Sequence, residues 1–220
     1  MKSALDFLVA LKANNDRDWF NANKEWFQKS AEEFKEFTNS LILGINEFDD
    51  FVGSIDPKDC IFRVYRDVRF SANKAPYKTN FGAYIARGGR KSPYAGYYFH
   101  LDTDSSFASG GIYMAEPNVM KRIREDIDLY PDDFLAIVES KKFKETFQFF
   151  DEEKLKRVPQ GFDKDSPVAE YFKFKHITPY HSLSEKDITD KNLLKNTLAV
   201  FKEMKPLVDF LNRSINGLNE

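Results

Sequence analysis

The side chains best suited to chemistry in this sequence lie close together, in residues 61–78. These positions hold three arginines, two lysines and two tyrosines beside a single acid. A guanidinium offers a planar fork to a phosphate or carboxylate, an ammonium a point charge, and a tyrosine a hydroxyl or a stacking face. This combination is typical of a cleft that binds an anion. The candidate ligand-binding residues are Arg63, Tyr65, Arg66, Asp67, Arg69, Ser71, Lys74, Tyr77, Lys78 and, as explained below, His100.

The first ten of these residues alternate in the manner of a strand. Alternation places an apolar row toward the core and a polar row on the other face. The apolar row is Phe62, Val64, Val68 and Phe70, and the polar row is Arg63, Tyr65, Asp67 and Arg69. Arg66 falls on the apolar face. Because a buried guanidinium needs a partner, Arg66 is expected to mark a bulge, to lie at the end of the sheet or to pair with a carboxylate.

A turn is predicted over residues 71–76, whose composition favours turns and which end in a proline. Such a turn folds Lys74, Tyr77 and Lys78 back over the polar row. Asp67 lies between arginines, so it is expected to orient one of them and to stay ionised, and not to act as a general base.

Charge is distributed unevenly along the chain. The whole sequence carries a net charge of −2, which disfavours a generic nucleic-acid binder. Residues 61–91, however, hold eight basic side chains and one acid, a local charge of +7, which leaves 25 basic and 34 acidic residues elsewhere, a charge of −9. A positive segment of this kind concentrates anionic ligands. The alternative is that these charges lie on separate, solvated faces.

Composition indicates a globular protein with a large core. Of the 220 residues, 42% are hydrophobic and 15% aromatic, which suits a single domain. Its parts would be a helical segment (1–48), a sheet with the basic motif (51–114) and a second helical segment (117–220). Cys60, the sole cysteine, excludes a disulfide framework and fits a reducing cytoplasm. No apolar run suits a signal peptide or a membrane span, so a soluble, cytoplasmic protein is expected.

Helices are expected on both sides of the basic segment. Residues 3–13 form an amphipathic helix, and Asn15, with Asp18 three positions on, is expected to cap a long helix that ends near residue 48. A short strand is expected at 51–55. Proline and capping signals predict helices at 118–129, 132–139, 141–150 and 167–176, and a terminal helix that starts at Ser184 and kinks at Pro206.

Strands are expected between these helices, at 79–87, 94–102 and 106–114, in addition to the one at 61–70. Gly110 and Gly111 suggest a bulge or a close backbone approach in the last of them. Short connections imply antiparallel pairing. The predicted fold class is therefore α+β, an antiparallel sheet of about four strands (roughly residues 60–114) packed by a long N-terminal helix and a C-terminal helical set.

Recognised catalytic motifs are absent from the sequence. It has no phosphate-binding glycine loop and no G-x-S-x-G element, so no cofactor is expected and no catalytic residue is assigned. His100, His176 and His181 are too scattered to predict a metal site. His100 ends a predicted strand in phase with Tyr98 and would lie beside the basic row. A lone histidine on a strand is more often structural, so both roles stay open.

The central motif R-x-Y-R-D-x-R-F-S-x-x-K-x-P-Y-K, at residues 63–78, resembles the signature of an uncharacterised bacterial and fungal family, domain of unknown function 2461. Three further segments resemble it as well: N-N-D-R-D-W-F-N-A-N-K at 14–24, G-G-I-Y-M-x-x-P at 110–117 and G-F-D-K-D-S-P at 161–167. The resemblance covers nearly the whole chain and implies one fold unit. It implies no activity.

Three functions are compatible with these residues. The first is a cleft for a small ligand that carries a phosphate or carboxylate, with or without turnover. The second is binding of single-stranded nucleic acid, because tyrosines and arginines on an antiparallel sheet combine stacking with charge. The third is a structural or protein-partner role, in which the basic segment meets an acidic surface. The oligomeric state is left open.

Overall fold

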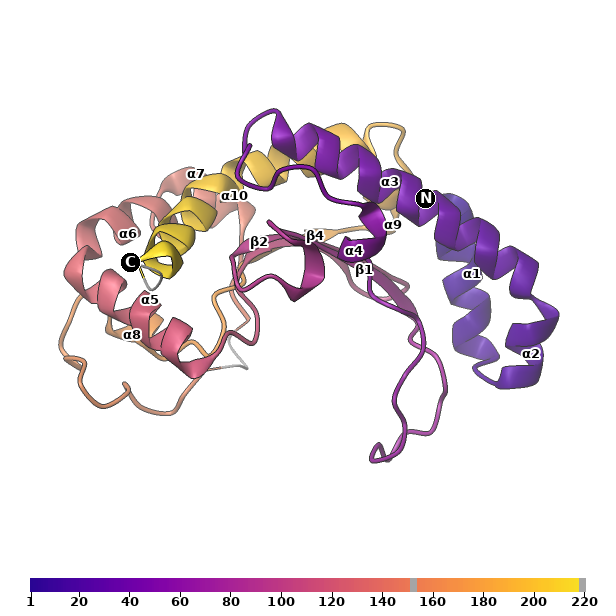
Figure 1. The fold of residues 1–220 in the computed structure, drawn as a ribbon, viewed down its shortest axis with the longest axis horizontal. Coiled ribbons are helices and arrows are strands. Elements are labelled where there is room, and N and C mark those ends of the chain that lie inside the picture. The colour runs from indigo at the N-terminus through magenta and orange to yellow at the C-terminus, as the bar shows by residue number, and fades with distance from the viewer. Residues whose placement is uncertain (151–153, 218–220) are drawn as a thin grey trace.

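The fold is built on an antiparallel sheet that has long helices on one face. A computed structural model describes residues 1–150 and 154–217. The strands lie in the order β1 (Asn80–Ile85), β2 (Gly96–Asp102), β3 (Ser106–Gly111) and β4 (Tyr180–Leu183), each antiparallel to its neighbour (Figure 1). The α+β class and the four-stranded antiparallel sheet are thus confirmed. The membership of the sheet is not, because β4 comes from the C-terminal part of the chain.

Three helices form the N-terminal part: α1 (Lys2–Ala13), α2 (Arg17–Ala22) and α3 (Lys24–Asn46). Asp16 begins α2 by accepting a hydrogen bond from the Trp19 backbone N–H at 2.8 Å. The predicted cap at Asn15 is therefore wrong by one residue. The predicted unbroken helix is also wrong, because the backbone of Asn23 leaves the helical conformation between α2 and α3.

Proline and serine caps begin several of the later helices. Pro117 and Pro131 occupy the first turn of α5 (Pro117–Leu129) and α6 (Pro131–Val138). Ser184 and Asp187 form the expected capping box, but it begins the short α9 (Glu185–Thr189), and the terminal helix α10 (Leu193–Asn216) starts later. The remaining helices are α4 (Pro57–Cys60), α7 (Lys141–Thr146) and α8 (Ala169–Phe172).

Several predicted bounds are wrong in this part of the structure. The expected helix at 167–176 shrinks to α8, and that at 141–150 shrinks to α7. The expected strand at 51–55 is absent, since these residues are turn and irregular structure. Within the described residues, no helix is long and apolar enough to cross a membrane.

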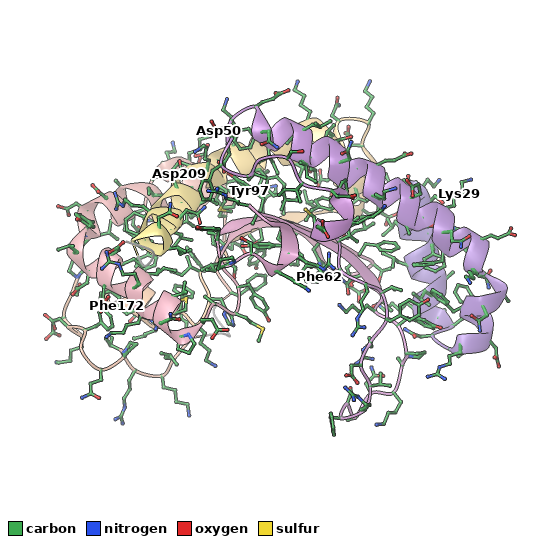
Figure 2. All side chains as sticks on the ribbon, viewed as in Figure 1. Lys29, Asp50, Phe62, Tyr97, Phe172 and Asp209 are labelled. Carbon is green, nitrogen blue, oxygen red and sulfur yellow. The ribbon has the colours of Figure 1, made fainter. Side chains whose placement is uncertain are left out.

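The core lies between the sheet and the helices α3 and α10 (Figures 1 and 2). The Phe34 ring of α3 lies 5.3 Å from Phe81 of β1, and Phe201 of α10 lies 5.2 Å from Tyr97 of β2. Tyr97 is fully buried, and its hydroxyl donates a 2.7 Å hydrogen bond to Asp49. Because side chains alternate along a strand, the neighbours of these core residues face the opposite side of the sheet. The site described below lies there.

Residues 61–70 do not form the predicted strand. They make isolated bridges, Ile61 to Ala83 and Tyr65 to Tyr77, and then run into a loop that projects from the sheet (Figure 1). Of the predicted core row Val64 is buried, whereas Phe62 is 37% exposed and Phe70 96%. Alternation alone does not make a strand, because a strand also needs a neighbour for its backbone hydrogen bonds. We refer to residues 63–77 as the arm.

Candidate functional site

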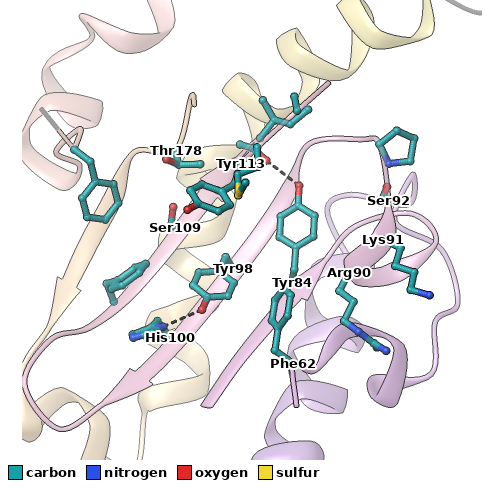
Figure 3. A pocket seen from close by; sticks show the side chains of 18 of the residues that line it. Phe62, Tyr84, Arg90, Lys91, Ser92, Tyr98, His100, Ser109, Tyr113 and Thr178 are labelled. Carbon is teal, nitrogen blue, oxygen red and sulfur yellow. Dashed lines mark hydrogen bonds between the residues drawn. The ribbon is translucent and has the colours of Figure 1, made fainter. Parts of the chain in front are cut away.

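A pocket of about 840 Å³ lies on the face of the sheet opposite α3 and α10 (Figure 3). This volume falls within the range of small-molecule sites, roughly 300–1,000 Å³. Strand residues Tyr84, Tyr98 and Ser109 form part of its lining. The far wall is the segment that follows β3, residues 112–116, with Val119 of α5.

Aromatic and other apolar side chains make up much of the pocket wall. Phe107 and the His100 ring stack 4.6 Å apart, and Phe107 meets Phe150 edge to face at 5.8 Å. Ten large hydrophobic side chains are exposed in the described part of the chain. Four of them line this pocket: Phe62, Tyr113, Met114 and Phe150. Such a concentration of exposed apolar surface in one hollow is typical of a ligand-binding site.

Cations gather at one side of the pocket. Figure 3 shows Arg90 and Lys91, from the 3₁₀ turn η1 (Gly89–Lys91), across the pocket from His100. Lys78 lies at the base of the arm, with its Nζ 5.7 Å from the centre of the Phe62 ring. Arg90 donates a 2.6 Å hydrogen bond to the Lys58 carbonyl. Among the described residues no carboxylate forms an ion pair with any of these three cations.

The pKa of Lys78 is lowered, first by burial and then by repulsion from Arg63. Both effects disfavour the charged ammonium. A bound anion would raise the pKa of Lys78 again, because it supplies a negative charge beside the ammonium. The one acid on the pocket wall among the described residues is Glu116, which is exposed. The cationic side of the pocket is therefore suited to a negatively charged group.

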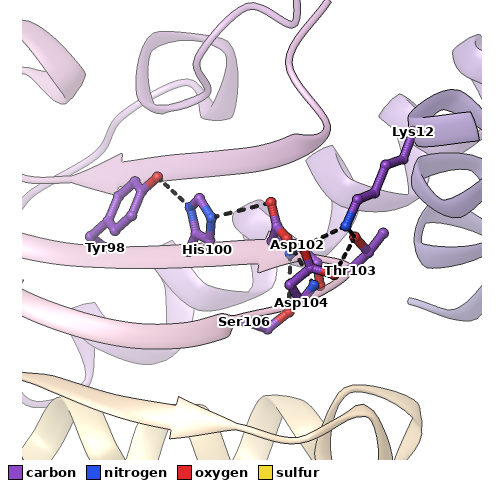
Figure 4. A network of polar contacts seen from close by, with 7 residues as sticks. All are labelled: Lys12, Tyr98, His100, Asp102, Thr103, Asp104 and Ser106. Carbon is purple, nitrogen blue, oxygen red and sulfur yellow. Dashed lines mark hydrogen bonds and ion pairs between the residues drawn. The ribbon is translucent and has the colours of Figure 1, made fainter. Parts of the chain in front are cut away.

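A polar chain runs from the pocket floor to the end of β2 (Figure 4). The Tyr98 hydroxyl lies 2.9 Å from His100 Nδ1, and His100 Nε2 lies 3.9 Å from Asp102. Burial lowers the pKa of His100, and the nearby Asp102 carboxylate opposes this effect. With Nε2–H directed toward the carboxylate, Nδ1 accepts the hydrogen bond from Tyr98. Burial also raises the pKa of Tyr98, so this hydroxyl is a donor and not a base.

The floor of the pocket is formed by strand residues, and the hydroxyl groups of Tyr84, Tyr98 and Ser109 there already have protein partners. The Tyr84 hydroxyl donates to the Tyr94 carbonyl at 2.8 Å and lies 3.0 Å from that of Gly111. Ser109, which is buried, donates to the Pro179 carbonyl at 2.8 Å. The floor therefore presents ring faces and edges to a ligand, and the cations supply its polar recognition.

Of the ten candidate residues predicted from the sequence, Lys78 and His100 line this pocket. The other eight belong to the arm, where several of them hold the loop in shape. Arg66 donates to the Ala75 carbonyl at 2.9 Å and to the Ser71 hydroxyl at 3.3 Å. The expected pairing with a carboxylate is wrong, because the guanidinium bonds to backbone and hydroxyl oxygens of the arm.

Lys74 and Asp67 also act within the arm. Lys74 Nζ donates to the Val68 carbonyl at 3.1 Å, so it does not reach over the predicted polar row. Asp67 accepts two hydrogen bonds from the Arg69 guanidinium, at 3.0 and 2.7 Å. This pair confirms that Asp67 orients an arginine, and the hydrogen bonds from Arg69 lower the pKa of Asp67.

The base of the arm is fixed to the N-terminal helices. Asn15 Nδ2 donates to the Tyr77 carbonyl at 3.0 Å, and the Tyr77 N–H donates to Asn15 Oδ1 at 3.1 Å. The Tyr77 ring stacks on Phe20 of α2, with ring centres 3.9 Å apart. Tyr77 is thus buried and structural, and Tyr65, which is half exposed, packs against it at 5.5 Å. These contacts decide the direction in which the arm projects.

Sequence reasoning missed most of the pocket. Arg90 and Lys91 were counted in the positive segment but were not among the candidate residues, and Phe62 was predicted to face the core. Tyr98 was in phase with His100, which was a usable signal. The far wall and Phe150 carry no local signal, since the fold brings them to the pocket from distant parts of the sequence.

Metal binding has no support in the described ranges 1–150 and 154–217, where no three His, Cys, Asp or Glu side chains are grouped to hold an ion. The fold and the pocket together define an α+β protein with a ligand-sized pocket on the open face of its sheet. The chain belongs to the family of conserved hypothetical proteins called domain of unknown function 2461, whose pattern it matches over residues 3–210. No curated protein and no solved structure matches it.

Proposed function

We propose that this protein binds an organic anion in the pocket on the open face of the sheet. The phosphate or carboxylate of the ligand lies at Lys78, Arg90 and Lys91, and its flat or apolar body lies against the aromatic wall. The observation that carries the proposal is the gathering of three cations, with no carboxylate partner in the described residues, beside exposed aromatic side chains. No catalytic residue is assigned, and the single buried Cys60 suits the cytoplasm.

Each group has a distinct part in binding. Lys78 is partly desolvated, so its attraction to an anion is screened less than that of a surface lysine. Arg90 is oriented by its bond to the Lys58 carbonyl and keeps further N–H donors for a ligand oxygen. Phe62 and Phe107 offer ring surface to an apolar body.

A thermal-shift screen tests this proposal. The probes are inorganic phosphate, sulfate, dicarboxylates, phenyl phosphate and nucleoside monophosphates. A probe present at a hundred times its Kd adds about 2.7 kcal/mol of stability. For a chain of this length, that raises Tm by roughly 5–10 °C. We expect phosphates with an aromatic body to give larger shifts than inorganic phosphate.

Two variants locate the effect. Lys78→Gln should abolish most of the shift, whereas Lys29→Gln, an exposed lysine of α3 (Figure 2), should leave it unchanged. Absence of a shift for every probe, or a shift that Lys78→Gln does not reduce, contradicts the proposal.

A further inference from the structure

Cations and aromatic rings continue from the pocket onto the arm. Lys78 and Phe62 flank the base of the arm, and Arg63 lies close enough to lower the pKa of Lys78. Toward the tip, Arg69 is mostly exposed and Phe70 is 96% exposed. Figure 1 shows the arm extending from the sheet on the side away from α3 and α10. The pocket lies on the same face of the sheet (Figure 3).

The tip is held in shape without being covered. Arg66, Lys74 and the Asp67–Arg69 pair tie the loop to itself, and Asn15 fixes its base. The Arg69 guanidinium lies over the Phe70 ring, 5.8 Å from its centre. Because the loop is already ordered, a partner that stacks on the exposed phenyl ring pays little conformational entropy to fix it.

The charge pattern favours a polyanion as the partner. Residues 61–91 carry eight basic side chains against one acid. Three of the eight line the pocket and four belong to the arm, whereas Arg87 lies over the Phe51 ring, outside the pocket lining. Repeated positive charges match the regular phosphates of a nucleic acid, and exposed rings match its bases. Because stacking on side chains requires bases that are not already paired, a single strand fits better than a duplex.

We propose that the pocket and the arm together bind single-stranded nucleic acid. One nucleotide occupies the pocket, and the neighbouring nucleotides lie along the arm, with a base stacked on Phe70. This inference rests on the proposed function, since the nucleotide in the pocket is the organic anion described above.

Fluorescence anisotropy with 5′-labelled oligothymidylates of 2 to 16 nucleotides tests the inference. Affinity is expected to rise with length and to level off at about four to eight nucleotides, a span within that of known single-strand sites. If about five cations contact phosphates, the plot of log affinity against log salt has a slope of about −3.5. Affinity for the octamer should then fall roughly 100-fold between 50 and 200 mM NaCl.

The variant Phe70→Ala distinguishes the contribution of the arm to binding from that of the pocket. It should weaken octamer binding at least about fivefold, the loss expected for one stacked base, while leaving the thermal shift with a nucleoside monophosphate unchanged. Because the Phe70 ring is exposed, the variant should keep the wild-type Tm. Leu43→Ala, an exposed apolar residue of α3, is the matched control and should bind the octamer like the wild type.

Three results overturn the inference. If the monophosphate binds as tightly as the octamer, the pocket takes a free ligand, and the proposed function stands without the polymer. If neither the monophosphate nor the octamer binds, and no probe of the thermal-shift screen raises Tm, both proposals fail. If the octamer does not bind and light scattering shows self-association that Phe70→Ala removes, the arm contacts a second copy of the chain.

Discussion

The sharpest structural prediction concerns Asn15, which fixes the base of the arm. Its side chain makes two hydrogen bonds to the Tyr77 backbone, at 3.0 and 3.1 Å, in a partly buried place. Asn15→Ala removes both bonds and leaves one N–H and one carbonyl of Tyr77 without a partner. An unsatisfied buried polar group costs about 1–3 kcal/mol, and a typical hydrogen bond contributes about 1 kcal/mol net. We expect a loss of about 2–3 kcal/mol in the free energy of unfolding.

Urea denaturation followed by tryptophan fluorescence measures this loss directly. Trp19 and Trp26 are the two tryptophans of the chain, and both pack against Phe7 near the altered site. For a protein of this size the predicted loss lowers Tm by roughly 5–10 °C. Trypsin should also cleave the arm faster in Asn15→Ala, at Arg66, Arg69 or Lys74, since the base no longer holds the loop.

Asn14→Ala is the matched control. Asn14 is exposed, and its side chain makes one hydrogen bond, to the Ala10 carbonyl at 3.0 Å, so the loss of that side chain should cost less than about 1 kcal/mol. Asn15→Asp tests the direction of the two bonds, because it keeps the acceptor for the Tyr77 N–H and loses the donor to the Tyr77 carbonyl. Equal stability of Asn15→Ala and Asn14→Ala would refute the claim that Asn15 fixes the arm.

Three further predictions follow from the surroundings of single residues. Gly111→Ala should destabilise the protein more than Gly161→Ala, although both glycines have positive φ. A Cβ on residue 111 would lie 1.9 Å from the Ile177 carbonyl oxygen, whereas a Cβ on residue 161 would have no atom within 4 Å. Equal losses of Tm in the two variants would contradict this prediction. Burial lowers the pKa of His100, so as the pH falls this histidine is protonated in the unfolded chain before it is protonated in the folded protein. The free energy of unfolding therefore decreases as the pH drops below about 6.5. In urea titrations from pH 7 to 5, His100→Gln should reduce this decrease, and an unchanged decrease would exclude His100 as its source. Burial raises the pKa of the Cys60 thiol to about 12. An aromatic disulfide reagent at pH 8 should therefore detect no thiol in the native protein and one thiol per chain in guanidinium. Rapid reaction of the native protein would show that the surroundings of Cys60 open to solvent.

Local sequence patterns predicted the features that depend on neighbours in the chain. Alternation along β2 placed Tyr98 and His100 on one face, and both line the pocket. Gly110 and Gly111 predicted a bulge or a close backbone approach, and the Ile177 carbonyl makes such an approach to Gly111. Asp67 orients Arg69 as expected.

Features that depend on distant contacts were not predictable in this way. Residues 61–70 alternate like a strand, but they form a projecting arm, whereas the four residues of β4 pair with β3. The role of Asn15 was also hidden, because its partner lies 62 positions away. The pocket joins the arm base, η1 and the segment after β3, an arrangement that no local pattern encodes.

The central claim, that the pocket on the open sheet face binds an organic anion, is tested most directly by NMR chemical-shift mapping. Phenyl phosphate is titrated into ¹⁵N-labelled protein, whose mass of 25.6 kDa permits the measurement. The account predicts that the largest changes occur at the amides of Lys78, Tyr98 and Tyr113. Changes confined to the hollow between α5 and α10, around Arg122 and Arg213, would contradict it and place the anion elsewhere.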